Sequence, residues 1–258
     1  MGWIVHKFGG TSLADAACFR RVADIVTRPA AQNVAVVVSA MRGTTDHLLG
    51  LIDRAARREP VEEMIAAMRD RYVGTARELL GADAAHVTDP FEKDVADIES
   101  VLKALALVRA ASERSRALVS GFGEVWSARL LARLLASGPY AGREVRFVDA
   151  REVLVIEPGE MGPIVAWDES RPRLERVLPP SFSGLAVITG FIAVDREGLP
   201  ATLGRNGSDY SASIFGALLG ASAVDIWTDV DGVMSADPRR VPEAAVIEQI
   251  SYNEAMEL

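Results

Sequence analysis

Short apolar runs alternate along the chain with longer segments of helical periodicity. The runs are continuous rather than alternating, which is typical of strands buried on both faces of a parallel sheet. They cover residues 3–6, 33–38, 185–189 and 223–227, with a weaker candidate at 144–148. Helical patterns lie between them, at 14–28, 45–58, 61–80, 89–118, 124–137 and 208–220. This alternation predicts an α/β fold with helices layered on a mostly parallel sheet.

Three segments depart from this alternation. Residues 59–118 are rich in Ala, Arg, Glu and Leu and carry almost no strand signal, which predicts two or three helices inserted between strands. Residues 157–184 carry five prolines, for which we expect loops around one short helix and no separate domain. The chain ends at 253–258 within a pattern that resembles the start of a helix, so we expect it to be cut short.

Composition and charge narrow the function classes. The 258 residues are 49% hydrophobic and 25% charged, as in an ordinary globular protein. A formal net charge of −8 disfavours a nucleic-acid binder that relies on phosphate neutralisation. We expect no membrane span and no signal peptide, because no long uncharged apolar run is present. The single cysteine, Cys18, excludes an internal disulfide, so a reducing cytoplasmic setting is expected.

The first candidate motif is Lys-Phe-Gly-Gly-Thr-Ser at residues 7–12, directly after a strand and before a helix. Glycines such as Gly9 and Gly10 let backbone N–H groups approach a phosphate, and Lys7 adds a positive charge. The motif matches neither a Walker A loop nor a dinucleotide-binding fingerprint. The alternative is a plain strand–turn–helix with a surface lysine.

A second motif, Gly-Arg-Asn-Gly-Ser-Asp at residues 204–209, opens a helix rich in Ala and Leu. The guanidinium of Arg205 can hold a carboxylate through two hydrogen bonds. Alternatively, Ser208 is the helix N-cap and Asp209 a first-turn acid that complements the helix dipole. Capping leaves Arg205 and Gly207 unexplained, which favours a binding function.

A third motif, Thr-Asp-Val-Asp-Gly at residues 228–232, follows the strand ending at Trp227. Ligands of α/β sheets bind beyond the carboxyl ends of strands. Asp229 is suited to hold Mg²⁺, directly or through water, or to meet a ribose hydroxyl. The alternative is a tight turn, for which Asp-Gly is suitable.

Two weaker candidates also precede helices. Ser39 and Thr45 flank the loop after the buried strand 33–38, where ligands usually bind, although Thr44 or Thr45 could simply cap the next helix. Glu124 lies near the start of another helix. Taken alone, it is better explained as a first-turn acid than as a binding residue.

In order and spacing, the three motifs at 7–12, 204–209 and 228–232 resemble those of aspartate kinases. The chain is similar to that family's catalytic domain from Trp3 to Leu258, especially to the kinase portion of bifunctional aspartokinases. The resemblance implies a three-layer α/β/α sandwich, and one catalytic domain over 1–258. It also implies transfer of the ATP γ-phosphoryl group to the side-chain carboxylate of L-aspartate, giving 4-phospho-L-aspartate and ADP. That is the first step of aspartate-family amino-acid biosynthesis, which leads to lysine and threonine.

The resemblance also implies roles for residues around the phosphates. Lys7 matches the lysine that neutralises the transferring phosphate, and Gly9 and Gly10 match its backbone donors. Asp209 matches the acid that orders the phosphoryl-transfer site. Ser39 matches a position near the phosphates. The cofactors implied are ATP and Mg²⁺, with no residue expected to ligate the metal directly.

For the acceptor amino acid, the resemblance implies a separate group of residues. Glu124 matches the acid that receives the α-ammonium group, and Arg205 matches the arginine that holds a substrate carboxylate. Thr45, Gly207 and Ser208 match positions beside the substrate. Because a carboxylate nucleophile is already ionised at neutral pH, the reaction requires no general base. The absence of a plausible catalytic histidine is consistent with this.

For the nucleotide, Thr228, Asp229 and Arg239 match binding positions, and Met234 occupies a position where the family commonly has a tyrosine beside the adenine. Methionine can still pack on the base, with altered stacking. We expect two further departures from the family: the C-terminal lysine that reaches the ATP phosphates and the regulatory ACT domains are missing. The partners expected are ATP and L-aspartate, with a possible homodimer.

Two alternatives to an aspartate kinase stay open at this point. The chain could phosphorylate another carboxylate or carbamate acceptor, because the charged pair expected around an amino acid does not determine its length. Alternatively, it could bind ATP and aspartate with little turnover, since a phosphate-contacting lysine is expected to be missing. Loss of one such electrostatic contact costs on the order of 10²-fold in rate.

Overall fold

The computed structural model describes the whole chain except residues 1, 29–32, 161, 229–231, 238–239 and 256–258. The chain divides into two compact units, Met1–Trp227 and Thr228–Leu258. The second unit holds the short helix α9 (Tyr252–Ala255) and an antiparallel bridge between Met234 and Val246. The other helices and strands described below all belong to the first unit.

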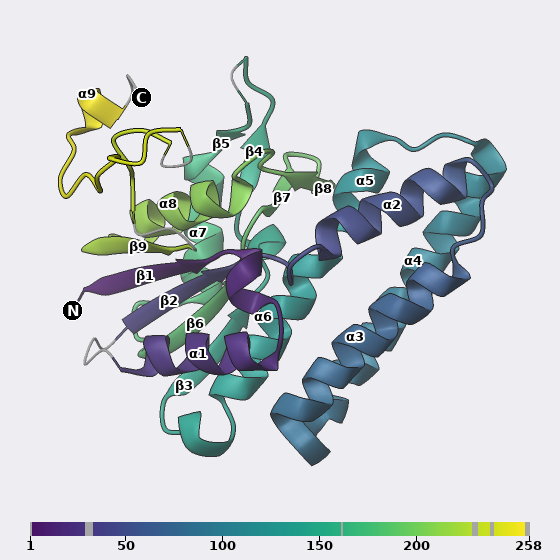
Figure 1. The fold of residues 1–258 in the computed structure, drawn as a ribbon, viewed down its shortest axis with the longest axis horizontal. Coiled ribbons are helices and arrows are strands. Elements are labelled where there is room, and N and C mark those ends of the chain that lie inside the picture. The colour runs from purple at the N-terminus through teal and green to yellow at the C-terminus, as the bar shows by residue number, and fades with distance from the viewer. Residues whose placement is uncertain (1, 29–32, 161, 229–231, 238–239, 256–258) are drawn as a thin grey trace. The chain divides into compact units, whose positions relative to one another are not determined.

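A five-stranded parallel sheet forms the centre of the first unit (Figure 1). Its strand order is β3-β6-β2-β1-β9, and every neighbouring pair is parallel. The strands are β1 (Trp3–Phe8), β2 (Asn33–Val38), β3 (Glu144–Val148), β6 (Gly184–Thr189) and β9 (Ala223–Trp227). All five strands predicted from the apolar runs are therefore confirmed, including the weak candidate β3.

Helices cover both faces of this sheet. Alternate side chains of β2 enter two different hydrophobic clusters: Val34, Val36 and Val38 enter one, and Ala35 and Val37 the other. The first cluster includes side chains of α1 (Ala16–Thr27) and α6 (Phe122–Leu135), and the second includes side chains of α8 (Gly207–Leu219). Burial on both faces explains why β2 is apolar from Val34 to Val38, and it confirms the layered α/β fold.

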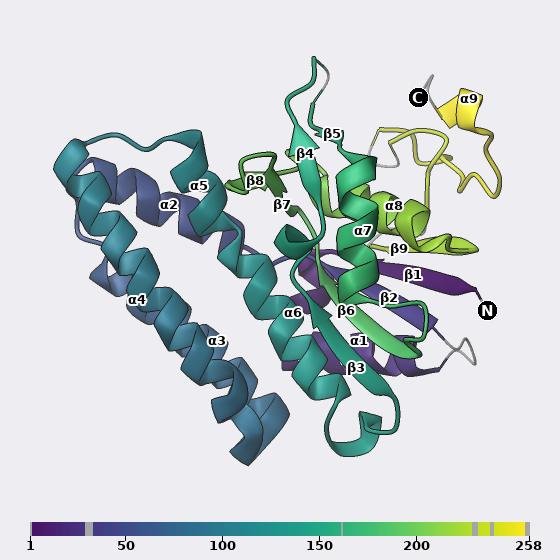
Figure 2. The same cartoon turned by 180° about the vertical axis from the view of Figure 1, so that it is seen from behind.

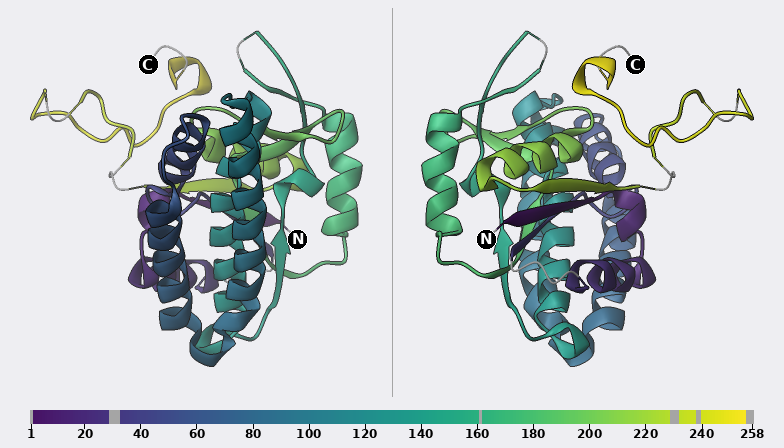
Figure 3. Two further views of the ribbon diagram at one scale, coloured as in Figure 1. Left: turned by 90° about the vertical axis from the view of Figure 1, so that its right-hand side faces the viewer. Right: turned by 90° about the vertical axis from the view of Figure 1, so that its left-hand side faces the viewer.

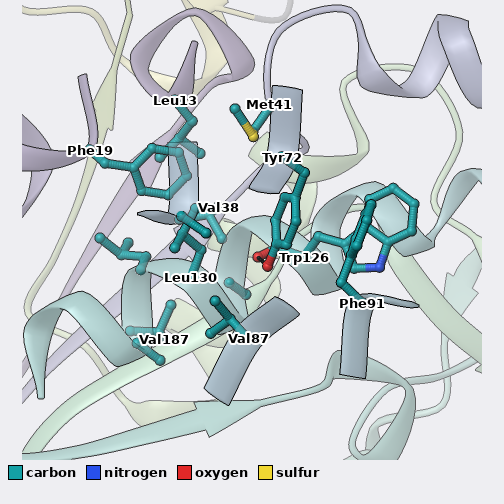
Figure 4. Close-up of a cluster of buried hydrophobic side chains, with 14 of the residues drawn as sticks. Leu13, Phe19, Val38, Met41, Tyr72, Val87, Phe91, Trp126, Leu130 and Val187 are labelled. Carbon is teal, nitrogen blue, oxygen red and sulfur yellow. Dashed lines mark hydrogen bonds between the residues drawn. The ribbon is translucent and has the colours of Figure 1, made fainter. Parts of the chain in front are cut away.

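The helices predicted within 59–118 are present and pack against the first cluster. Helices α3 (Glu62–Leu80) and α4 (Ala85–Val108) lie side by side (blue in Figure 3). Tyr72 of α3 stacks on Phe91 of α4 with ring centroids 4.3 Å apart, and Phe91 meets Trp126 of α6 edge-on at 4.7 Å (Figure 4). The indole N–H of Trp126 donates to Asp94 at 3.0 Å, so an aromatic stack ties these helices to the sheet layer.

The single helix predicted over 89–118 is wrong. Helix α4 ends at Val108, and α5 (Glu113–Ser120) starts after a break. Arg109 has a left-handed φ of 56°, and the Ser112 side chain accepts a hydrogen bond from the Ser115 N–H at 3.1 Å, which caps α5. The Ala- and Leu-rich pattern continues through this break, so periodicity alone did not reveal it.

A second, four-stranded sheet was not predicted. Its order is β5-β4-β7-β8, and its strands are β4 (Val155–Glu157), β5 (Ile164–Val165), β7 (Ile192–Asp195) and β8 (Pro200–Thr202). Strands of two to four residues are too short to show a periodicity. Within 157–184 the expected short helix is present as α7 (Trp167–Val177), which lies beside β4 (Figure 2).

The remaining regular element relevant to the site is α2 (Thr44–Ala56), which follows β2 after a short loop. Across the described part of the chain, no helix has both the length and the apolar content to cross a membrane.

Candidate active site

A cleft of about 400 Å³ opens at the carboxyl ends of β1 and β2. Its walls come from the turn after β1, the β2–α2 loop, the first turn of α6, and the loop that opens α8. Nine of the residues predicted from the motifs line it: Lys7, Gly9, Gly10, Ser39, Thr45, Glu124, Gly207, Ser208 and Asp209. Segments as far apart in sequence as Lys7 and Asp209 therefore meet where a parallel sheet is expected to bind its ligand.

An ion pair lies in this cleft. The Lys7 ammonium is 2.7 Å from a carboxylate oxygen of Asp209, in the first turn of α8. Lys7 is only 8% exposed, so the alternative of a plain surface lysine is wrong. A buried ammonium has lost its hydration, and Asp209 provides the compensating charge. This arrangement holds a cation at a fixed point of the cleft, where it is available to an anionic ligand.

Gly10 is where the turn after β1 touches the β2–α2 loop. A methyl group at this position would lie 2.8 Å from the Ala40 carbonyl oxygen and 3.4 Å from the Arg42 Cα. Such a contact with backbone atoms cannot be relieved by rotating a side chain. Glycine is therefore required here by the close approach of two loops, in addition to any approach of a phosphate.

The hydroxyls of Ser39 and Ser208 are hydrogen-bonded at 2.9 Å, which joins the end of β2 to the start of α8. The interpretation of Ser208 as an N-cap is wrong, because the N-cap position of α8 is Asn206, with a left-handed φ of 54°. Similarly, Gly43, not Thr45, is the N-cap residue of α2. Thr45 and Ser208 thus lie in the first turns of α2 and α8 and line the cleft, and neither is the N-cap of its helix.

Glu124 is a buried acid in this cleft and more than a first-turn residue of α6. It is 3% exposed, and one carboxyl oxygen accepts a hydrogen bond from the Ala40 N–H at 3.2 Å. The other oxygen is buried with no hydrogen-bond partner among the described residues. Burial raises the pKa of this carboxyl from 4.5 to about 8, against the smaller opposing effect of the Ala40 N–H. The unpaired oxygen is suited to a cationic ligand group.

Arg205 does not line this cleft. It is exposed and lines an adjoining cavity, whose wall shares Gly204, Asn206 and Asp209 with the cleft. The segment 204–209 therefore separates the cleft from this second cavity, and Asp209 lines both.

Motif analysis missed Phe191, which follows β6 and lines the cleft. Its φ of 66° is rare for a bulky residue, and its ring lies against Gly207, where an added methyl group would be 2.8 Å from the Phe191 Cδ2 atom. The Phe191 N–H donates to the Ser211 hydroxyl at 2.8 Å, which helps hold this backbone. The signal available in the sequence was its position just beyond a buried strand.

The predicted nucleotide residues fall elsewhere. Thr228 and Met234 belong to the second unit, and Asp229 and Arg239 lie outside the described residues. Among the residues that the structure describes, no three His, Cys, Asp or Glu side chains form a group that could hold a metal ion.

Comparison with known proteins identifies the family. The model of the Amino acid kinase family matches residues 2–258. The chain belongs to this family. It is 39% identical over 259 residues to the chloroplastic bifunctional aspartokinase/homoserine dehydrogenase 2 of Arabidopsis thaliana, covering 99% of this chain and 28% of that protein.

Two further comparisons agree with this family. The chain is 38% identical to the bifunctional aspartokinase/homoserine dehydrogenase 2 of Escherichia coli K12, covering 98% of this chain and 30% of that protein. It also superimposes on the crystal structure of E. coli aspartokinase III in complex with aspartate and ADP, with a TM-score of 0.85 and 32% identity. That match covers 98% of this chain and 55% of the other. The chain thus spans less than a third of the length of the two bifunctional relatives and about half of aspartokinase III.

Proposed function

We propose that this chain catalyses ATP-dependent phosphorylation of the side-chain carboxylate of L-aspartate. The observation that carries the proposal is the cleft itself, in which the Lys7–Asp209 ion pair faces a glycine turn and the buried, half-paired carboxyl of Glu124. Similarity to an aspartokinase whose structure contains aspartate and ADP supports the choice of acceptor and nucleotide. The whole chain, 1–258, would form the kinase domain.

The chemistry needs only positioning and charge. The acceptor carboxylate is ionised at neutral pH, so no base has to remove a proton before attack. Phosphoryl transfer then depends on holding the acceptor in line with the γ-phosphate and stabilising the charge on its oxygens. Lys7 would stabilise that charge, and backbone N–H groups of Gly9 and Gly10 and the Ser39 hydroxyl would bind phosphate oxygens. Asp209 would keep the Lys7 ammonium in place.

Acceptor recognition would use the opposite charges of an amino acid. The free oxygen of Glu124 would accept the α-ammonium group, and Arg205 would move toward the cleft from its exposed position to bind a carboxylate. Thr45, Gly207 and Ser208 would line the acceptor.

Nucleotide binding would use residues of the second unit, namely Thr228, Asp229, Met234 and Arg239. Mg²⁺ would arrive on the phosphates and supply further positive charge during transfer. We further propose a cytoplasmic setting, which fits the single cysteine. We also propose that the reaction leads into lysine and threonine biosynthesis and that the protein forms a homodimer.

The test is ADP release with MgATP and L-aspartate, with hydroxylamine present to trap the acyl phosphate as aspartyl hydroxamate. We expect the hydroxamate to form and Lys7→Met to abolish it, because charge stabilisation in the cleft is lost. Lys93→Met, at an exposed lysine of α4, is the matched control and should retain activity. Preferential phosphorylation of glutamate or N-acetylglutamate would refute the choice of acceptor, and binding without turnover would refute the activity.

A further inference from the structure

Two walls of the cleft are joined by one side chain from outside the sheet layer. Arg71 lies on α3, and its guanidinium bonds two loops at once. Its Nη1 donates to the Arg42 carbonyl at 2.7 Å, and its Nη2 donates to the Ala14 carbonyl at 3.0 Å. Arg42 belongs to the β2–α2 loop, and Ala14 ends the short turn that contains Gly10.

The separation of these loops determines the geometry of the cleft. They already touch where Gly10 meets Ala40, so neither can move toward the other. The Ala40 N–H also holds the buried carboxyl of Glu124. A shift of the β2–α2 loop away from the glycine turn would therefore displace phosphate donors and the Glu124 carboxyl together. Arg71 opposes this shift, because it bonds to both loops.

The sequence neighbours of Ala14, Arg42 and Arg71 hold the backbone from the side of the hydrophobic core. Leu13, Met41 and Tyr72 all enter the same buried cluster, and Figure 4 shows them close to one another. Each precedes or follows a residue of the Arg71 bridge. Apolar packing thus holds the two loops where they face the core, and the Arg71 guanidinium holds them where they face solvent. Because the donors of an arginine spread in a rigid plane, they can meet two carbonyls from different loops, whereas a lysine presents a single point charge.

We propose that Arg71 is a positioning residue for phosphoryl transfer, which holds the glycine turn after β1 and the β2–α2 loop at the separation that the substrates require. The proposal rests on the proposed kinase function, and it adds a residue from the helical segment 59–118 to the machinery of the site. Arg71 does not line the cleft, and it acts through the backbone of the two loops.

The test compares Arg71→Ala with Arg69→Ala, a matched control on the same helix whose guanidinium pairs instead with Glu92 of α4 at 2.9 Å. The first measurement is amide hydrogen exchange of residues 10–14 and 39–43. We expect faster exchange in both loops for Arg71→Ala only. The second is kcat/KM, which we expect to fall about tenfold or more relative to the control, because small displacements of reacting groups are costly.

Arg71→Lys should restore less than half of the loss, since one ammonium cannot serve both carbonyls in the same geometry. Unchanged loop exchange, or faster exchange with kcat/KM equal to that of the control, would overturn the proposal. If the unmodified protein shows no turnover, the kinase function fails. In that case the exchange experiment and the affinities for MgATP and aspartate, which Arg71→Ala should weaken and Arg69→Ala should not, still decide the role of Arg71.

Discussion

Replacing Glu124 by glutamine should stabilise the protein increasingly as the pH rises. In the folded chain the pKa of this carboxyl is raised to about 8, whereas the unfolded chain ionises near 4.5. Between these values the unfolded state binds fewer protons than the folded state. The free energy of unfolding of the unmodified protein therefore falls as the pH rises through this window, and it becomes level above about 8.

The magnitude follows from the two pKa values. At about 1.4 kcal/mol per pH unit, ionisation of Glu124 should lower the free energy of unfolding by about 3 kcal/mol at pH 7 and by about 5 kcal/mol above pH 8. Glutamine keeps the carbonyl oxygen that accepts from Ala40 and carries no charge at any pH. Any cost of its unpaired amide group is independent of pH and adds only a constant.

The assay is urea unfolding from pH 5 to pH 8 without ligand, followed by tryptophan fluorescence, to which the buried Trp126 contributes. The measured quantity is the free energy of unfolding of Glu124→Gln minus that of the unmodified protein, so titrations elsewhere cancel. Glu63→Gln, at an exposed position in the first turn of α3, is the control for replacing an acid by an amide. A difference that stays constant over this pH range would refute the assignment of a buried, protonated Glu124.

The remaining predictions concern the glycine turn, the serine bridge and ligand binding. Gly10→Ala should destabilise the protein by about 1–3 kcal/mol in urea unfolding, because its methyl group would lie 2.8 Å from a backbone carbonyl, whereas Gly74→Ala, in open space on α3, should stabilise it by about 0.5–1 kcal/mol. A double-mutant cycle of Ser39→Ala and Ser208→Ala should give a coupling of about 0.5–1.5 kcal/mol, and additive effects would exclude the hydrogen bond. Aspartate binding at pH 7 should release about one proton, because an ammonium group beside Glu124 favours its ionised carboxylate. Calorimetry in buffers of different ionisation enthalpy measures this release, and Glu124→Gln should abolish it.

The fold was predictable where one local pattern has one structural meaning. The run at 34–38 is apolar at every position, and burial of β2 on both faces is the arrangement that such a run permits. The second sheet was not predictable, because its strands of two to four residues are stabilised by neighbours rather than by their own sequence. The break after α4 was likewise hidden, since the composition of 89–118 favours helix throughout.

In the candidate active site, too, some residues were predictable from the sequence and others were not. The glycine turn and the loop 204–209 were recognisable from their residues, because glycines, a lysine and an arginine near helix starts are suited to anions whatever their surroundings. Glu124 and Ser208 were ambiguous, since a first-turn acid and a capping serine are ordinary helix features. Only the structure distinguishes the two cases, by placing the Glu124 carboxyl against a backbone N–H that is 84 positions away in sequence.

By itself, therefore, the sequence determined the five strands of the central sheet, the layered architecture and the motifs that can bind an anion, because hydrophobic periodicity and glycine turns act over a few residues. Tertiary structure alone decided which groups are buried and which meet. Three features depend on segments that are far apart along the chain: the raised pKa of Glu124, the ion pair of Lys7 with Asp209, and the hydrogen bonds of Arg71 to two loops. Their energies depend on desolvation and on distances in space, and neither is encoded in a local pattern.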